Sequence, residues 1–86
     1  MRILVCDVER EIRNIIKLLL ERVGYEVVVA ECADAAISFL RANRDVDLCI
    51  MDVMMPGKSG IEAVAEIREF STLPIIFLTA KSLESD

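Results

Sequence analysis

The chain has 86 residues, a formal net charge of −5 and a pI of about 4.7, and 55% of its residues are hydrophobic. This length fits a single domain. The acidic balance, with no basic stripe, argues against direct binding of nucleic acid. No apolar run approaches the roughly 20 residues that a membrane helix needs, and the amino end has no signal-peptide layout. We therefore expect a cytoplasmic domain that contacts neither membranes nor, by itself, DNA.

Segments with the periodicity of strands alternate with segments that have the periodicity of helices. Valine-rich or continuously apolar runs predict strands at 2–7, 25–30, 46–52 and 75–79. Apolar residues that recur every three or four positions predict helices at about 9–22, 33–42 and 60–69. Gly24 is expected to end the first helix in a left-handed conformation.

The alternation of strands and helices predicts a parallel sheet covered by helices on both faces. Right-handed crossovers restrict the topology further. We predict one α/β domain over residues 1–86, with a flavodoxin-like doubly wound parallel sheet in the strand order 2-1-3-4.

The helix periodicities also predict which side chains face the sheet. The expected inward residues are Ile12, Ile15, Ile16, Leu19 and Val23 in the first helix, Ala33, Ala36, Ile37 and Leu40 in the second, and Ala63, Val64 and Ile67 in the third. Four cations fall largely on the outer face of the first helix, where solvation is the simplest interpretation: Arg10, Arg13, Lys17 and Arg22.

The three cysteines, Cys6, Cys32 and Cys49, have no CxxC spacing, and two of them lie in predicted buried strands. An odd number of small, buried thiols indicates core residues in a reducing compartment rather than a disulfide or a metal cluster.

Asp52 directly follows the apolar run Leu48-Cys49-Ile50-Met51, which predicts a strand buried on both faces. Asp7 and Thr79 also follow apolar runs, so three polar groups end neighbouring strands at the carboxyl edge. Two close carboxylates repel, so one is protonated or a cation lies between them. A hard divalent ion such as Mg²⁺ suits carboxylate oxygens. The alternative is that the acids only cap nearby helices or turns.

These motifs resemble the receiver domain of bacterial two-component response regulators over the whole chain. The resemblance rests on Ile3-Leu4-Val5-Cys6-Asp7 with Glu9, on Asp47-Leu48-Cys49-Ile50-Met51-Asp52-Val53-Met54-Met55-Pro56-Gly57 with Gly60, and on Pro74-Ile75-Ile76-Phe77-Leu78-Thr79-Ala80-Lys81. The loop Met54-Met55-Pro56-Gly57 and the ending Leu78-Thr79-Ala80-Lys81 are most similar to receivers attached to winged-helix DNA-binding domains.

The resemblance implies a mechanism and partners. Asp52 would accept a phosphoryl group from a sensor histidine kinase, and Thr79 would donate its hydroxyl to a phosphoryl oxygen. Mg²⁺ would be held by Asp7, Asp52 and the Met54 carbonyl. The phosphorylated domain would switch an interaction surface and control a transcription-regulating output domain, through which alone DNA would be contacted. Such a domain is a phosphoacceptor that assists its own phosphotransfer and is not an independent enzyme.

Val8 departs from the family pattern. It stands where receivers carry the acid that touches Mg²⁺ directly, and valine cannot coordinate a metal. Weakened Mg²⁺ affinity is expected, with Glu9 as a candidate substitute ligand. The alternative function is therefore a degenerate receiver-like module for protein interaction or dimerisation that is not phosphorylated.

The chain is also incomplete relative to the family pattern. A receiver continues through a fourth helix, a fifth strand with a lysine that pairs with the phosphoryl group, and a fifth helix. Lys81 is expected to be solvated rather than a replacement. Ile75-Ile76-Phe77-Leu78 then becomes a sheet edge. Burial of these four side chains is worth about 6–12 kcal/mol, against a net domain stability of about 5–15 kcal/mol. We therefore expect that the chain associates through this edge, swaps elements with a second copy, or is the remnant of a longer protein.

An enzyme is the third class. Phosphatases with a catalytic aspartate need an acid two residues later, where this chain has Met54. A Gly-rich phosphate loop is also missing. Both observations argue against an independent enzyme.

Overall fold

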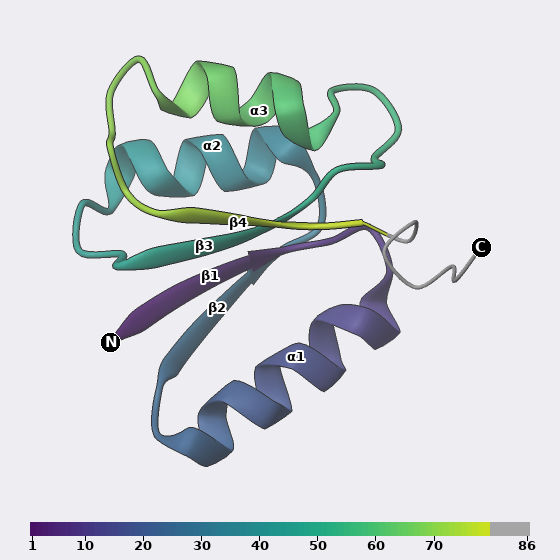
Figure 1. The fold of residues 1–86 in the computed structure, drawn as a ribbon, viewed down its shortest axis with the longest axis vertical. Helices are drawn as coiled ribbons and strands as arrows, with labels where there is room; N and C mark the ends of the chain where they lie inside the picture. Colours follow the sequence, from purple (N-terminus) through teal and green to yellow (C-terminus); the bar gives the residue numbers. More distant parts are fainter. Residues whose placement is uncertain (80–86) are drawn as a thin grey trace.

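A computed structural model describes residues 1–79 of the chain, which form one parallel sheet in the strand order β2-β1-β3-β4 (Figure 1). The predicted doubly wound α/β fold is confirmed in this part of the chain. The elements follow the predicted alternation: β1 (Arg2–Cys6), α1 (Arg10–Val23), β2 (Glu26–Ala30), α2 (Ala33–Ala42), β3 (Leu48–Asp52), α3 (Gly60–Ile67) and β4 (Ile75–Leu78).

The helices form two unequal layers. α2 and α3 lie together on one face of the sheet, and α1 lies alone on the other (Figure 1). The larger core cluster fills the space under α2 and α3, and includes Leu4, Cys6, Cys49 and Met51 from the sheet. The smaller cluster lies under α1 and has only three buried members, Ile3, Val5 and Val27.

The two helices over the larger core, α2 and α3, largely follow the predicted pattern. α2 has the expected bounds, and all four of its predicted inward residues are buried. In α3, Ala63 and Ile67 are buried as expected, whereas Val64 is only half-buried. α3 ends at Ile67, two residues before the predicted boundary, and a turn follows.

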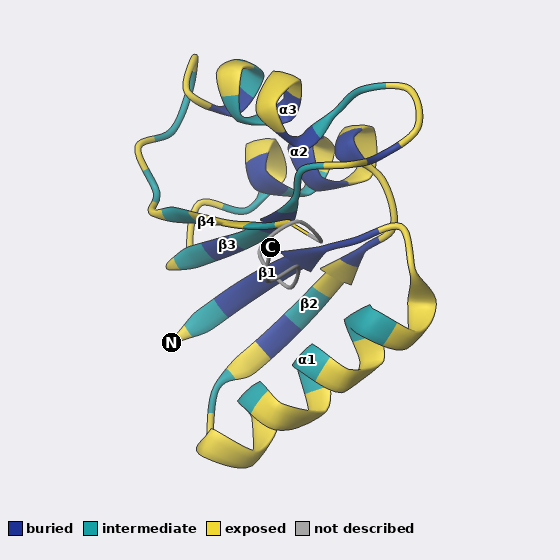
Figure 2. Ribbon diagram, turned by 45° about the vertical axis from the view of Figure 1, so that its right-hand side comes forward, coloured by how far each residue is buried: buried dark blue, intermediate teal, exposed yellow. Residues whose placement is uncertain are grey.

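The prediction for α1 was wrong in one respect, because no residue of this helix is fully buried (Figure 2). Of its predicted inward residues, Ile12 and Ile16 are half-buried, whereas Ile15, Leu19 and Val23 are more than half exposed. A single helix on a sheet contacts it only along a narrow stripe. The apolar band of α1 is wider than the stripe that the sheet covers. Gly24 does adopt the predicted left-handed conformation, with φ of 105°.

β3 is buried on one face rather than on both. Cys49 and Met51 face the larger core and are fully buried, whereas Leu48 and Ile50 on the α1 side are half-buried. The reason is the same: α1 packs mainly on β1 and β2, so it covers β3 incompletely.

Within the described residues, β4 pairs only with β3, which makes it an edge strand as predicted. Its central residues Ile76 and Phe77 are exposed, while Ile75 and Leu78 are half-buried. Lys81 lies outside the described residues. No helix in the described part of the chain is long and apolar enough to cross a membrane.

Candidate functional site

The carboxyl edge of the sheet carries the three polar residues that the sequence singled out. Asp7 follows β1, Asp52 ends β3, and Thr79 follows β4. β1 and β3 are hydrogen-bonded neighbours, with Cys6 beside Met51. Leu78 lies beside Asp52 in the β3–β4 register, so Thr79 leaves the sheet next to the same strand end. The switch point of strand order therefore lies between the two acids, as predicted.

Asp7 is a buried acid, only 5% exposed. Its backbone N–H donates to the Ala30 carbonyl at 3.2 Å, which extends the β1–β2 ladder beyond the strand. Its side-chain Oδ1 accepts a hydrogen bond from the Glu9 N–H at 2.8 Å. One carboxylate oxygen thus shapes the β1–α1 loop, and the side chain also interacts with Asp52.

Asp52 lies where its charge is opposed. Burial is the main cause that raises the pKa of this carboxyl above its usual value, and the charge of Asp7 is the next. Backbone N–H groups act in the opposite direction. The Met54 N–H donates to Oδ1 at 3.1 Å, and the backbone of Val8 in the β1–α1 loop also lowers the pKa of the carboxyl. The carboxylate is therefore held between two loops, with backbone donors on it and an acid beside it.

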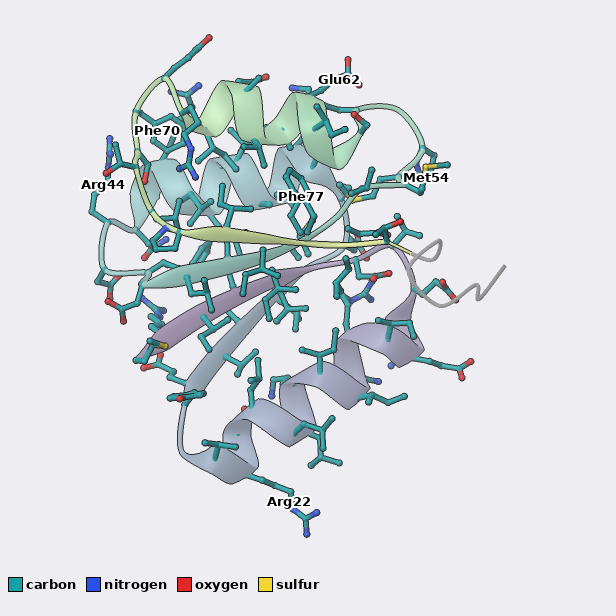
Figure 3. The ribbon with its side chains drawn as sticks, in the orientation of Figure 1. Arg22, Arg44, Met54, Glu62, Phe70 and Phe77 are labelled. Atoms are coloured by element: carbon teal, nitrogen blue, oxygen red, sulfur yellow. The ribbon has the colours of Figure 1, made fainter. Side chains whose placement is uncertain are left out.

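Two crowded carboxylates form a site that a small hard cation would relieve, since it would bind both and remove their repulsion. The residues that could hold such an ion are Asp7, Asp52 and the Met54 carbonyl. The Met54 side chain points away from the fold into solvent (Figure 3), so only its backbone is suited to this role. Among residues 1–79 no three acidic or thiol side chains gather into a metal-binding group, so Glu9 does not complete a trio with the two aspartates. Val8 is 38% exposed and offers an aliphatic side chain.

The loop that follows Asp52 is anchored by backbone contacts. The Val53 N–H donates to the Leu78 carbonyl at 3.1 Å, and the Gly60 N–H donates to the Val53 carbonyl at 3.0 Å. Ser59 caps α3 in a reciprocal capping box with Glu62. Gly60 is required by contact rather than by its dihedral angles. A Cβ here would overlap the Asp52 carbonyl oxygen and lie 2.9 Å from the Asp52 carbonyl carbon.

Lys58 ties the same loop to two helices. Its Nζ lies 2.6 Å from a carboxylate oxygen of Glu66 in α3 and 3.1 Å from one of Asp34 in α2. Both ion pairs raise the pKa of the lysine. Sequence reasoning missed this residue, because Lys58 and its partners are far apart in the chain.

Arg13 was also missed, since it was assigned to the solvated face of α1. Its Nη1 instead turns back to the β1–α1 loop and donates to the Asp7 carbonyl at 2.8 Å and to the Val8 carbonyl at 3.3 Å. The available signal was its position. A cation in the first turn of a helix opposes the helix dipole, so a local partner for it is favourable.

A cavity of about 330 Å³ lies at the opposite, amino edge of the sheet. Arg44 and Phe70 line it, and the Arg44 guanidinium lies over the Phe70 ring, 5.1 Å from its centroid (Figure 3). The paired acids are not part of it. The crowded acids favour the carboxyl edge, rather than this cavity, as the place for chemistry.

Comparison with known proteins gives a consistent assignment. The model of the response regulator receiver domain matches residues 3–86. The chain is 48% identical over 85 residues to the transcriptional regulatory protein YvrH of Bacillus subtilis, covering 98% of this chain and 35% of that protein. It is 39% identical over 85 residues to the transcriptional regulatory protein CpxR of Escherichia coli, covering 99% and 36%. The chain thus spans about a third of the length of these relatives.

Solved structures share the fold. The response regulator TrrA of Thermotoga maritima, in complex with Mg²⁺ and BeF, has a TM-score of 0.87 and 42% identity, covering 92% of this chain and 69% of that one. In the complex of TrrA with the histidine kinase ThkA, the matching chain has a TM-score of 0.87, covering 99% and 74%. The family match, the relatives and the paired acids at the switch point agree. The chain belongs to the response regulator receiver domain family.

Proposed function

We propose that this chain accepts a phosphoryl group on Asp52 in two-component signal transduction. The observation that carries the proposal is the placement of Asp52 beside buried Asp7 at the switch point, where the Met54 N–H donates to Oδ1 and the Val8 backbone lowers the pKa of the carboxyl. Asp52 is only half-buried, so an incoming group can reach it. The family membership and the named relatives support the same role.

The proposed phosphotransfer is a displacement at phosphorus. A carboxylate oxygen of Asp52 attacks the phosphorus of a phosphohistidine and forms an acyl phosphate. The P–N bond breaks, and its electron pair returns to the imidazole ring. The acyl phosphate carries about −1.5 to −2 charges beside Asp7, in place of the single negative charge of the carboxylate. Thr79, at the neighbouring strand end, would donate its hydroxyl to a phosphoryl oxygen.

Asp7, Asp52 and the Met54 carbonyl would hold Mg²⁺, which when bound supplies positive charge to the transferring phosphoryl group. Val8 contributes no side-chain ligand, so we propose that the affinity for the ion is weakened. Glu9 remains a candidate only if its side chain moves toward the acids.

The partners follow from the same assignment. A sensor histidine kinase would be the phosphodonor, as the complex of TrrA with ThkA suggests for a related receiver. The curated relatives are transcriptional regulators, which supports an output domain that contacts DNA in the whole protein. The chain itself would act in the cytoplasm as a phosphoacceptor rather than as an independent enzyme. The exposed β4 edge would allow self-association or domain swapping.

The alternative is a receiver-like interaction module that is never phosphorylated. Val8 is the observation that favours it, because this residue leaves the acid pair with one side-chain ligand fewer than the family pattern. Both functions use the same fold and differ in whether Asp52 reacts.

Intact mass after incubation with acetyl phosphate, with and without Mg²⁺, separates the two functions. We expect a Mg²⁺-dependent gain of one phosphoryl group that is absent in Asp52→Asn, which keeps the shape of the side chain but removes the nucleophile. No gain in a chain that is folded by circular dichroism would instead support the interaction module. A gain that persists in Asp52→Asn would place the acceptor elsewhere.

A further inference from the structure

Arg13 occupies an electrostatically unfavourable position unless it has a specific partner. It lies in the first turn of α1, where the helix dipole favours anions, and the N-cap residue Glu9 makes no side-chain capping bond. The guanidinium compensates by reaching back over the β1–α1 loop. Its Nη1 donates to the Asp7 carbonyl at 2.8 Å and lies 3.3 Å from the Val8 carbonyl. Hydrogen bonds from a charged donor are about twice as strong as neutral ones.

The Asp7 carbonyl and the Val8 N–H belong to one planar peptide group and point in opposite directions. Arg13 holds the oxygen end of this group. The N–H end acts on the carboxylate of Asp52, because the Val8 backbone lowers the pKa of that carboxyl. A single rigid peptide therefore lies between the guanidinium of α1 and the acid at the end of β3.

We propose that Arg13 is a positioning residue for Asp52 and acts through the Asp7–Val8 peptide. The guanidinium fixes the plane of this peptide and polarises it, so that the Val8 N–H becomes a stronger and better directed donor. Val8 thereby serves the site through its backbone although its side chain cannot bind a metal. The consequence of this positioning for phosphotransfer rests on the proposed function.

Two other contacts make the peptide a stiff relay. The Glu9 N–H donates to the Asp7 carboxylate at 2.8 Å, which closes the loop on the side of β1. The Asp7 N–H donates to the Ala30 carbonyl at 3.2 Å, which fixes the start of the loop to β2. Arg13 supplies the remaining restraint at residues 7 and 8. If Arg13 only stabilised α1, its replacement would change the Val8 amide to the same extent whether or not Asp52 is present.

The test is the amide resonance of Val8 in ¹⁵N-labelled protein without metal or phosphodonor. We expect the Val8 amide proton to shift upfield and to exchange faster with solvent in Arg13→Met, because its acceptor contact weakens. Asp52→Ala should shift it in the same direction. In the double variant, the loss of Arg13 should add little, since the acceptor has already gone. Arg10→Met removes a cation from the same helix turn, while the bonds to the Asp7 and Val8 carbonyls come from Arg13, so this variant should leave the Val8 amide unchanged.

The opposite outcomes are equally specific. A Val8 amide that does not respond to Asp52→Ala, or whose responses to Arg13 and Asp52 simply add, would overturn the proposal and leave Arg13 as a staple of the helix. If Arg13→Met does not fold, Arg13→Lys decides instead. This variant keeps the charge but not the planar donor, so an intermediate shift supports the relay and no shift contradicts it.

Phosphorylation by acetyl phosphate gives a second readout. We expect the maximal rate in Arg13→Met to fall by roughly tenfold, less than the roughly 10²–10³-fold that follows loss of a donor that touches a reacting oxygen. The KM for acetyl phosphate should change little. If the wild-type chain is not modified at all, the proposed function fails, while the resonance experiment still decides the role of Arg13.

Discussion

The Asp52 carbonyl oxygen occupies the space in which a side chain at Gly60 would begin. The first residue of α3 therefore packs directly on the backbone of the proposed phosphoacceptor. The Gly60 N–H also donates to the neighbouring Val53 carbonyl at 3.0 Å. Because Gly60 has no side chain and its N–H bonds to the Val53 carbonyl, α3 can begin close to the end of β3.

Gly60→Ala should be strongly destabilising. The added methyl group meets backbone atoms, which cannot rotate away, so either α3 or the end of β3 must move. We expect the free energy of unfolding in urea to fall by about 3 kcal/mol, at the upper end of the usual cost of overpacking. Gly57→Ala is the matched control, because its Cβ meets nothing within 4 Å and only its φ of 78° opposes the substitution. A loss of about 1 kcal/mol is expected there. Equal losses in the two variants would contradict the contact argument.

Asp52→Asn should stabilise the metal-free chain near neutral pH. Burial and the charge of Asp7 raise the pKa of Asp52 above 3.8, so the folded chain keeps this proton to a higher pH than the unfolded chain does. The free energy of unfolding of the wild type therefore falls as the pH rises from 3.8 through the raised pKa. Asparagine cannot ionise and still accepts a hydrogen bond. We expect a higher Tm for the variant at neutral pH and a gap that closes below pH 3.8.

Glu69→Gln, an exposed carboxyl in the turn after α3, controls for the loss of one negative charge. A stabilisation of the same size in that variant would assign the effect to net charge rather than to the acid pair.

The three cysteines should differ in reactivity. Cys6 and Cys49 are buried, and burial raises the pKa of each thiol to about 12, whereas Cys32 is exposed. Because the thiolate is the reactive form, a thiol reagent should label only Cys32 in the folded chain and all three cysteines in denaturant. Mass spectrometry of the labelled peptides provides the count. Rapid labelling of Cys6 or Cys49 under native conditions would show that the sheet opens more readily than its packing indicates.

Val8→Asp should strengthen Mg²⁺ binding. The substitution restores an acid next to Asp7 at an exposed position, so a third carboxylate becomes available to the ion. We expect a roughly tenfold lower Kd by isothermal titration calorimetry. Val23→Asp adds the same charge at the far end of α1 and should have no such effect. Identical Mg²⁺ affinities for Val8→Asp and the wild type would show that position 8 does not limit the site.

Ile76→Lys should reduce self-association. Ile76 is 53% exposed on β4, and a lysine on an edge strand opposes pairing with another strand. Light scattering at high protein concentration should give a mass nearer the monomer for this variant than for the wild type. Ile61→Lys, which places the same change on the exposed side of α3, should not alter the association. A wild-type chain that is itself monomeric would contradict self-association through β4.

Sequence periodicity predicted the elements best where both sides of a contact are apolar. α2 matched residue by residue, because the larger core surrounds one face of it. α1 matched in its extent but not in its burial, since periodicity records which side chains are apolar and not how much surface lies opposite them. Side-chain hydrogen bonds also affect where a strand ends. Asp7 lies just beyond β1, where its carboxylate accepts the Glu9 N–H.

The acids of the site were predictable because the carboxyl ends of adjacent parallel strands meet at one edge. The groups around them were harder to predict. Arg13 acts through backbone carbonyls, which have no signature in sequence. Gly60 was expected only to open a helix, whereas its contact with Asp52 depends on how closely that helix approaches the strand.

Because the two helix layers are packed unequally, the two halves of the site are held with different firmness. Asp52 and Gly60 belong to the half that is anchored in the larger core, whereas the loop with Asp7 and Val8 leads into α1, which has no fully buried residue. Local unfolding draws on the least buried elements first. The site should therefore open by release of α1 and its loop while β3 stays in place, so the proposed phosphoacceptor Asp52 remains fixed while the loop beside it moves.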